Sequence, residues 1–96
     1  MAARVPTATG YFMYTKSNCK WCDIAKATLP QVVAVNVDHL LQPNNLEFLH
    51  FVARFSGTTP TTFPMVFYNN IYLGGCTESL EHLQLMEDIG GGRGDI

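Results

Sequence analysis

The first half of the sequence alternates a strand-like run, a helical run and a second strand-like run, and this order limits the possible folds more than any other feature. The aromatic-rich stretch Gly10–Thr15 and the β-branched stretch Val32–Val37 are both short enough for buried strands. Between them, Cys22–Leu29 favours a helix that Pro30 ends. Two strands separated by a helix pair in parallel through a right-handed crossover, which predicts a βαβ unit.

The second half changes from alternation to a hairpin followed by a helix. A helix is predicted over Leu46–Phe55, where apolar residues line one face. Two apolar runs, Pro64–Tyr68 and Ile71–Leu73, are joined by Asn69-Asn70, and two asparagines tolerate the positive φ of a tight antiparallel turn. Thr77 is placed to cap a last helix, whose apolar residues recur every three positions until a run of glycines ends it.

Together these elements predict an α/β fold in the order β-α-β-α-β-β-α, with a four-stranded mixed sheet and helices on both faces. The length of 96 residues suits one domain over residues 1–96. Residues 1–9 and 91–96 fall outside the predicted elements, and we expect them to be flexible ends.

Charge and cysteine content exclude several classes of function. A formal net charge of -2 gives no basic field for nucleic acid, and no stretch is apolar enough for a membrane span or a secretory signal. The three cysteines do not form the even-numbered framework of a secreted, disulfide-stapled domain. We therefore expect a cytoplasmic protein without nucleic-acid or membrane partners, in which a close pair of cysteines is reactive.

The segment Cys19-Lys20-Trp21-Cys22 lies at the junction of the first strand and the first helix. A helix N-terminus favours an anion, and Lys16 adds positive charge nearby, so the pKa of the Cys19 thiol is predicted to be below its ordinary value. Cys19 is the predicted nucleophile, and Cys22, one turn further on, is the predicted resolving thiol. The alternative reading is half of a zinc site, but a second pair of ligands is missing, so we predict no metal.

Two further motifs precede the hairpin and the last helix. A cis bond before Pro64 would leave the backbone N–H and C=O of Phe63 free to pair with an extended thiol peptide, although a proline at a strand start is common. The turn Gly74-Gly75-Cys76-Thr77-Glu78 offers backbone and hydroxyl donors to a carboxylate, although a simple hairpin exit and helix cap would read the same way.

In this order, the three motifs resemble the glutaredoxin family of the thioredoxin superfamily, from Tyr11 to about Ile89. Family members carry Lys-x-x-Cys-x-x-Cys after a strand, a Thr-Val-Pro segment and a Gly-Gly-x-Asp-type turn. The matching segments here are Lys16 to Cys22, Thr62-Phe63-Pro64, and Gly74-Gly75-Cys76-Thr77. The resemblance implies a thioredoxin-like fold and a dithiol glutaredoxin with glutathione as the reductant.

The resemblance also implies roles for individual residues. Lys16 would meet the glycine carboxylate of glutathione, the Phe63 backbone its cysteine moiety, and Thr77 with the Cys76 backbone its γ-glutamyl end. Pro64 and Gly75 shape the same site, and Trp21 is expected to cover the ligand beside Cys19, or else to be a packing residue. Cys76 itself is expected to be a buried, inert thiol, with a second redox site as the alternative.

The sequence departs from the family pattern within two of these motifs. Lys20-Trp21 stands where relatives have Pro-Tyr, Thr77 stands where an acidic residue is common, and Glu78 is expected to substitute for that carboxylate. Arg54 is a candidate for the helix residue that adds a contact to the glycine carboxylate, although it also suits an exposed helix position.

These motifs predict a glutathione-disulfide oxidoreductase that reduces protein disulfides, with ribonucleotide reductase as one candidate partner, and glutathione mixed disulfides. We expect it to work as a monomer. The alternative is a dimer that binds a [2Fe–2S] cluster through Cys19 and glutathione, as some glutaredoxins without the proline do. A third hypothesis is a thioredoxin-like protein recycled by a flavoenzyme, which the lack of a tryptophan before Cys19 disfavours.

Overall fold

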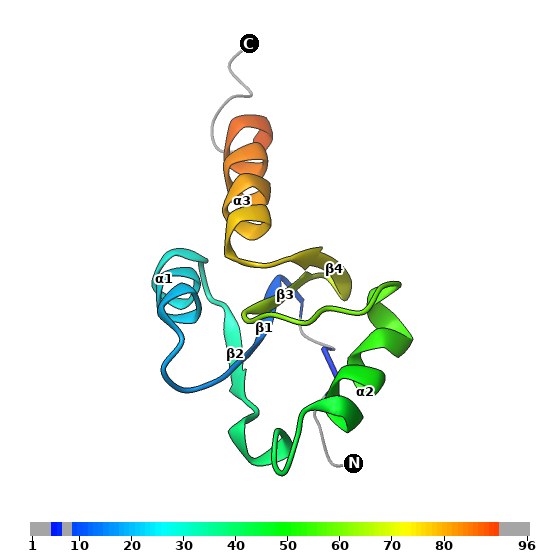
Figure 1. Ribbon diagram of the computed structural model, residues 1–96. Helices are drawn as coiled ribbons and strands as arrows, with labels where there is room; N and C mark the ends of the chain where they lie inside the picture. The colour runs from blue at the N-terminus through cyan, green and yellow to red at the C-terminus, as the bar shows by residue number, and fades with distance from the viewer. Residues whose placement is uncertain (1–4, 7–8, 91–96) are drawn as a thin grey trace.

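A computed structural model describes residues 5–6 and 9–90 of the chain (Figure 1). The predicted element order is confirmed, with one short 3-10 helix, η1, added after the second strand. The elements are β1 (Tyr11–Thr15), α1 (Lys20–Thr28), β2 (Val33–Asn36), η1 (Asp38–Leu40), α2 (Leu46–Ser56), β3 (Met65–Tyr68), β4 (Ile71–Gly74) and α3 (Cys76–Gly90). The predicted flexible ends lie almost entirely outside the described residues.

The four strands form one mixed sheet in the order β2-β1-β3-β4. β1 pairs in parallel with β2 and antiparallel with β3, and β3 pairs antiparallel with β4. Asn69 and Asn70 join β3 to β4 with φ values of 48° and 71°, as the hairpin prediction requires. The parallel first half and antiparallel second half are therefore confirmed, and β1 lies inside the sheet with a neighbour on each side.

Alternating residues of β1 supply two cores, one on each face of the sheet. Tyr11 and Met13 pack with Cys22, Ala25 and Leu29 of the α1 region, and with residues of α3. Full burial of a large apolar side chain contributes about 1.5–3 kcal/mol, so this alternation anchors β1 strongly. The arrangement places α1 and α3 on one face (Figure 1).

The opposite face packs against α2. Phe12 and Tyr14 contact Phe48 and Val52 there, and the rings of Tyr14 and Phe48 meet edge to face with centroids 5.2 Å apart. Aromatic pairs in this geometry add about 0.5–1.5 kcal/mol beyond the area they bury. Helices thus cover both faces of the sheet, as predicted. The two cores together hold β1 in place, and with it the C-terminal end of the strand, after which the Cys19–Cys22 segment follows.

Three predicted boundaries were wrong. α1 begins at Lys20 instead of Cys22, because Cys19 occupies the N-cap position and the intervening residues already have helical geometry. β2 is shorter than Val32–Val37, because the chain turns into η1 directly after Val37. Thr77 does not cap α3, because the helix has already begun at Cys76.

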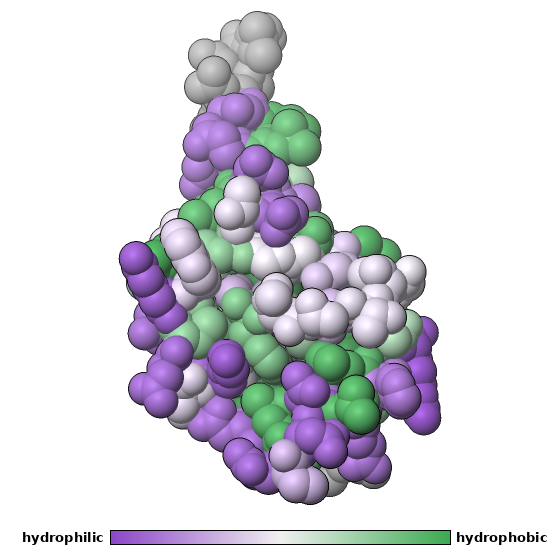
Figure 2. Space-filling view, viewed as in Figure 1, coloured by the Kyte–Doolittle hydropathy of each residue, from purple (hydrophilic) through white to green (hydrophobic). Residues whose placement is uncertain are grey.

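The apolar repeat of α3 is only partly covered. Leu80 and Leu83 pack on the sheet, whereas Leu85, Met86 and Ile89 are exposed. Figure 1 shows the C-terminal half of α3 extending beyond the sheet, and Figure 2 shows apolar residues along one side of that part. Within the described ranges, none of the helices has the length and apolarity needed to cross a bilayer.

The first part of α3 is tied to β1 by a polar contact. The hydroxyl of Tyr11 and Nδ1 of His82 are hydrogen-bonded at 2.8 Å, and the ring of Tyr68 lies 4.6 Å from the His82 ring.

Replacing Tyr11 by Phe removes this hydrogen bond and keeps the ring. Tyr11 is only 4% exposed, so water has little access to replace the hydrogen bond that His82 loses. We therefore expect the free energy of unfolding to fall by about 1 kcal/mol. Urea unfolding followed by circular dichroism measures it. Tyr72→Phe is the control, since the Tyr72 hydroxyl has no partner among the described residues. Equal losses in the two variants would contradict the account.

Candidate functional site

Cys19 lies where the chain passes from β1 into α1. Residues 16–18 leave the buried strand, and Cys19 takes the N-cap position with extended φ and ψ of -122° and 100°. The backbone N–H of Cys22 donates to the Cys19 sulfur at 3.1 Å. The sulfur therefore occupies the place where a capping oxygen usually sits, at the positive end of the helix dipole.

The two cysteines differ in what surrounds them, although a disulfide joins them in this structure and their Cα atoms are 5.2 Å apart. Cys19 is 8% exposed and lines an open groove, whereas Cys22 belongs to α1, is 3% exposed and packs in the core on the inner side of that helix. Cys22 is therefore the less accessible of the two. An incoming thiol meets Cys19 first, while Cys22 lies within reach of it on the adjacent turn.

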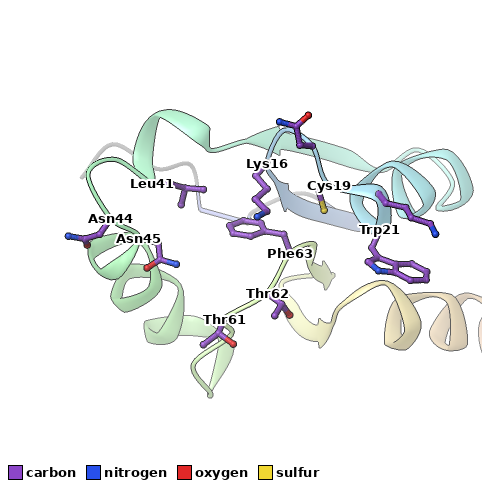
Figure 3. Close-up of a pocket in the computed structure, with 11 residues that line it drawn as sticks. Lys16, Cys19, Trp21, Leu41, Asn44, Asn45, Thr61, Thr62 and Phe63 are labelled. Carbon is purple, nitrogen blue, oxygen red and sulfur yellow. The ribbon is translucent and has the colours of Figure 1, made fainter.

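The groove beside Cys19 has a volume of about 580 Å³ and runs away from α1 toward the start of α2 (Figure 3). Lys16 and Phe63 lie near its middle, where the Lys16 ammonium is 5.9 Å from the centre of the Phe63 ring. Trp21, which is 55% exposed, stands beside Cys19, and Lys20 lies 5.3 Å from its ring. The far end is lined by Leu41, Asn44, Asn45 and Thr61.

The Phe63–Pro64 peptide bond is cis, which is the conformation that the sequence left open beside an ordinary strand-start proline. Phe63 precedes the first residue of β3 by two positions, so its backbone groups are outside the strand ladder. Its ring is stacked with that of Phe48, with centroids 6.1 Å apart, and it packs against both cores. Phe63 is thus held by both cores and lines the groove beside Cys19.

The glycine turn before α3 is closed by Glu78. The carboxylate Oε1 of Glu78, the third residue of α3, accepts a hydrogen bond of 2.8 Å from the N–H of Gly75, the residue before the helix. This is the glutamate contact of a capping box, and it differs from the cap by the Thr77 hydroxyl that the sequence predicted. Gly74 has a φ of +135°, and a Cβ there would lie 2.8 Å from Glu78 Cγ, so both the turn and the cap require glycine. Thr77 is exposed in the first turn of α3.

The three predicted motifs meet in space. A second, smaller hollow of about 210 Å³ is lined by Trp21, Thr62, Phe63, Pro64, Gly75, Cys76, Thr77 and Glu78. It shares Trp21, Thr62 and Phe63 with the Cys19 groove, so the two hollows adjoin. Of the candidate residues, all but two line one of these hollows: Lys16, Cys19, Trp21, Phe63, Pro64, Gly75, Cys76, Thr77 and Glu78 do, whereas Cys22 and Arg54 do not.

Charge is distributed unevenly along this combined site. Lys16 and Lys20 lie on the Cys19 side and Glu78 at the glycine turn. Burial, followed by the charge of Glu78, raises the pKa of the Cys76 thiol, so this cysteine stays protonated at neutral pH. No group of three or more His, Cys, Asp or Glu side chains lies close enough to hold a metal ion within residues 5–6 and 9–90.

Sequence reasoning missed part of the site. Arg54 lies on an exposed part of α2 with Glu47 and His50, and it does not line the Cys19 groove. The groove instead meets Asn44 and Asn45, which directly precede α2 and belong to none of the three motifs. Asn18, Leu41 and Thr61 also line the groove, and their loops gave no pattern from which that could be predicted.

The fold resembles that of several solved structures, including three glutaredoxins. They are the holo form of glutaredoxin C1 from Populus tremula x tremuloides (TM-score 0.63, 24% identity, 86% of this chain and 82% of that chain), oxidised glutaredoxin 2 from Chlamydomonas reinhardtii (0.60, 20%, 88% and 85%) and a dithiolic glutaredoxin from Trypanosoma brucei brucei (0.58, 18%, 88% and 87%). No family model and no curated protein matches the sequence. The resemblance found in the sequence is confirmed at the level of the fold, which is that of glutaredoxins.

Cys76 provides a test of the electrostatic picture. Because it is 6% exposed and its pKa is raised by burial and by Glu78, we expect iodoacetamide at neutral pH to modify Cys19 in the reduced protein while Cys76 reacts at least about tenfold more slowly. Mass spectrometry of digested protein over time measures both rates. Cys76 should become reactive in urea, and a Cys76 that reacts equally fast in folded and unfolded protein would contradict the burial argument.

Proposed function

We propose that this chain is a dithiol glutaredoxin, a glutathione-dependent oxidoreductase that reduces protein disulfides and glutathione mixed disulfides. The observation that carries the proposal is the meeting of Cys19, the cis Phe63–Pro64 segment and the Gly75–Glu78 turn around two adjoining hollows. A cysteine pair on this fold supports thiol-disulfide chemistry, and the other two motifs supply the means to hold a small anionic thiol.

The proposed reaction begins with the Cys19 thiolate attacking one sulfur of a substrate disulfide. A bond forms between Cys19 and that sulfur, the substrate S–S bond breaks, and the departing sulfur takes a proton from solvent. Cys22, deprotonated, then attacks the Cys19 sulfur, which releases the second substrate thiol and leaves the Cys19–Cys22 disulfide. Two glutathione molecules return the pair to the dithiol in two exchanges and leave as glutathione disulfide.

Glutathione would span both hollows in this proposal. Its glycine carboxylate would meet Lys16, its cysteine moiety would pair with the Phe63 backbone beside Pro64, and its γ-glutamyl end would reach Gly75, the Cys76 backbone, Thr77 and Glu78. Trp21 would form a wall of the ligand site. This arrangement is supported by the shared lining residues Trp21 and Phe63, which join the cysteine side to the glycine turn.

The length of the groove supports protein disulfides as further substrates. Beyond Phe63 it continues to Asn45 and Thr61, whose neutral side chains suit the backbone of a peptide chain better than a second carboxylate. Ribonucleotide reductase would be one such partner. The proposal includes a monomeric enzyme and a cytoplasmic location, since a dithiol of this kind is recycled only in a reducing compartment.

Substituting each cysteine of the pair by serine tests the mechanism. Cys19→Ser removes the nucleophile, so turnover of a glutathione mixed disulfide should fall on the order of a thousandfold or more. Cys22→Ser, the same substitution one helical turn away, should keep this turnover and lose reduction of protein disulfides. The coupled assay with glutathione reductase measures both, and an active Cys19→Ser variant would rule the mechanism out.

The second candidate function is a glutathione-ligated [2Fe–2S] dimer. It is favoured by Lys20-Trp21 in place of Pro-Tyr, and one of the similar structures is described as a holo form. The donors fit only in part, because Cys19 is the one cysteine that lines the groove and a cluster would need a second chain and two glutathione thiolates. Our proposal predicts that freshly purified, anaerobically handled protein is a colourless monomer. Visible cluster absorption in a dimer would favour the second candidate.

A further inference from the structure

A carboxylate outside the cysteine motif holds the loop that presents Cys19. Asp38 begins η1 directly after β2, and its Oδ1 accepts a hydrogen bond of 2.9 Å from the backbone N–H of Ser17. Its Oδ2 accepts a second, short hydrogen bond from the Ser17 hydroxyl. One side chain therefore fixes both polar donors of a residue that lies two positions before the nucleophile.

The position of Asp38 is itself secured by the end of the sheet. The last paired residues of the parallel strands are Thr15 and Asn36, and the N–H of Val37 still donates to the Thr15 carbonyl at 2.9 Å. The Asp38 N–H donates to Oδ1 of Asn36, also at 2.9 Å. The backbone hydrogen bonds between the two segments end at Thr15 and Val37. Beyond that point, the Asp38 carboxylate continues the attachment by binding Ser17.

The hydrogen bonds from Ser17 to Asp38 matter because the loop between β1 and α1 makes few other stabilising contacts. Lys16, Ser17 and Asn18 are exposed, and Asn18 has a φ of 55°, a conformation that non-glycine residues adopt rarely. Cys19 follows immediately and must stay at the N-cap for the Cys22 N–H to face its sulfur. If Ser17 were released, the sulfur would spend less time at the helix end.

From these contacts we propose that Asp38 is a positioning residue for the nucleophile: through Ser17 it keeps Cys19 at the N-terminus of α1 and so keeps its thiolate stabilised. The inference rests on the proposed role of Cys19. Asp38 does not touch the reacting sulfur. The hydrogen bonds from Ser17, followed by the contact with Asn36 and the nearby charge of Lys16, hold the pKa of the Asp38 carboxyl below its usual value, so Asp38 is ionised at neutral pH.

The test compares three variants of the full-length, reduced protein. Asp38→Ala removes both acceptors, Ser17→Ala removes one hydrogen bond, and Asp38→Asn keeps an oxygen for the Ser17 N–H and an amide for its hydroxyl. Asp88→Ala, the same change on the exposed part of α3, is the control. The rate of Cys19 alkylation by iodoacetamide is measured across pH, with mass spectrometry to identify the site.

We expect Asp38→Ala to shift the alkylation profile to higher pH and to lower the rate at mildly acidic pH by about tenfold, which corresponds to about one unit in the pKa of Cys19. Ser17→Ala should shift it part of the way, while Asp38→Asn and Asp88→Ala should stay close to wild type. A positional role predicts this rescue by asparagine, whereas a purely electrostatic role would move both Asp38 variants alike and to lower pH.

An Asp38→Ala profile that superimposes on wild type would overturn the inference, as would equal shifts of both Asp38 variants. Should Asp38→Ala fail to fold, Ser17→Ala decides, because an unmoved profile in that variant overturns the inference equally. A wild-type Cys19 that reacts no faster than Cys76 contradicts the proposed function instead. The two failures are therefore distinguishable.

Discussion

The contact between the Cys19 sulfur and the first turn of α1 is the interaction on which the rest of the site depends. At 3.1 Å from the Cys22 nitrogen, the sulfur takes the place of a helix cap, so the same geometry that ends the loop also favours negative charge on Cys19, the proposed nucleophile. A one-unit fall in pKa represents about 1.4 kcal/mol of preference for the thiolate. One or two well-oriented backbone donors and the helix dipole can supply an effect of this size.

That contact is maintained by the core beneath it. β1 is buried on both faces, so its end cannot move without disturbing the clusters around Met13 and Tyr14. Cys22 and Ala25 hold α1 on one face of the sheet, and Asp38 secures the exposed loop between strand and helix. Phe63 forms the opposite wall of the groove, and it is held in place because it packs against both of these cores. The Cys19 sulfur, only 8% exposed, thus lines the groove on a buried support.

Sequence patterns predicted the element order and the two helical layers because apolar periodicity and turn residues are local signals. They also identified the residues that meet around Cys19, through motifs whose joint occurrence resembles a family. They failed where contacts come from distant segments. Glu78 and not Thr77 caps α3, because the longer glutamate side chain lies against Gly74 and reaches the N–H of Gly75. Asn45 lines the groove and Asp38 binds Ser17 because the segment between β2 and α2 folds back toward the Cys19 loop. No local sequence pattern predicts that arrangement.

The most direct measurement of the central claim is the ultraviolet absorbance of thiolate in the reduced wild-type protein as pH is raised. If the helix end stabilises the anion, one thiolate per chain should appear at mildly acidic pH, well before the other cysteines ionise, and it should vanish in Cys19→Ser. Absorbance that rises only at alkaline pH, with no separate early step, would contradict the account.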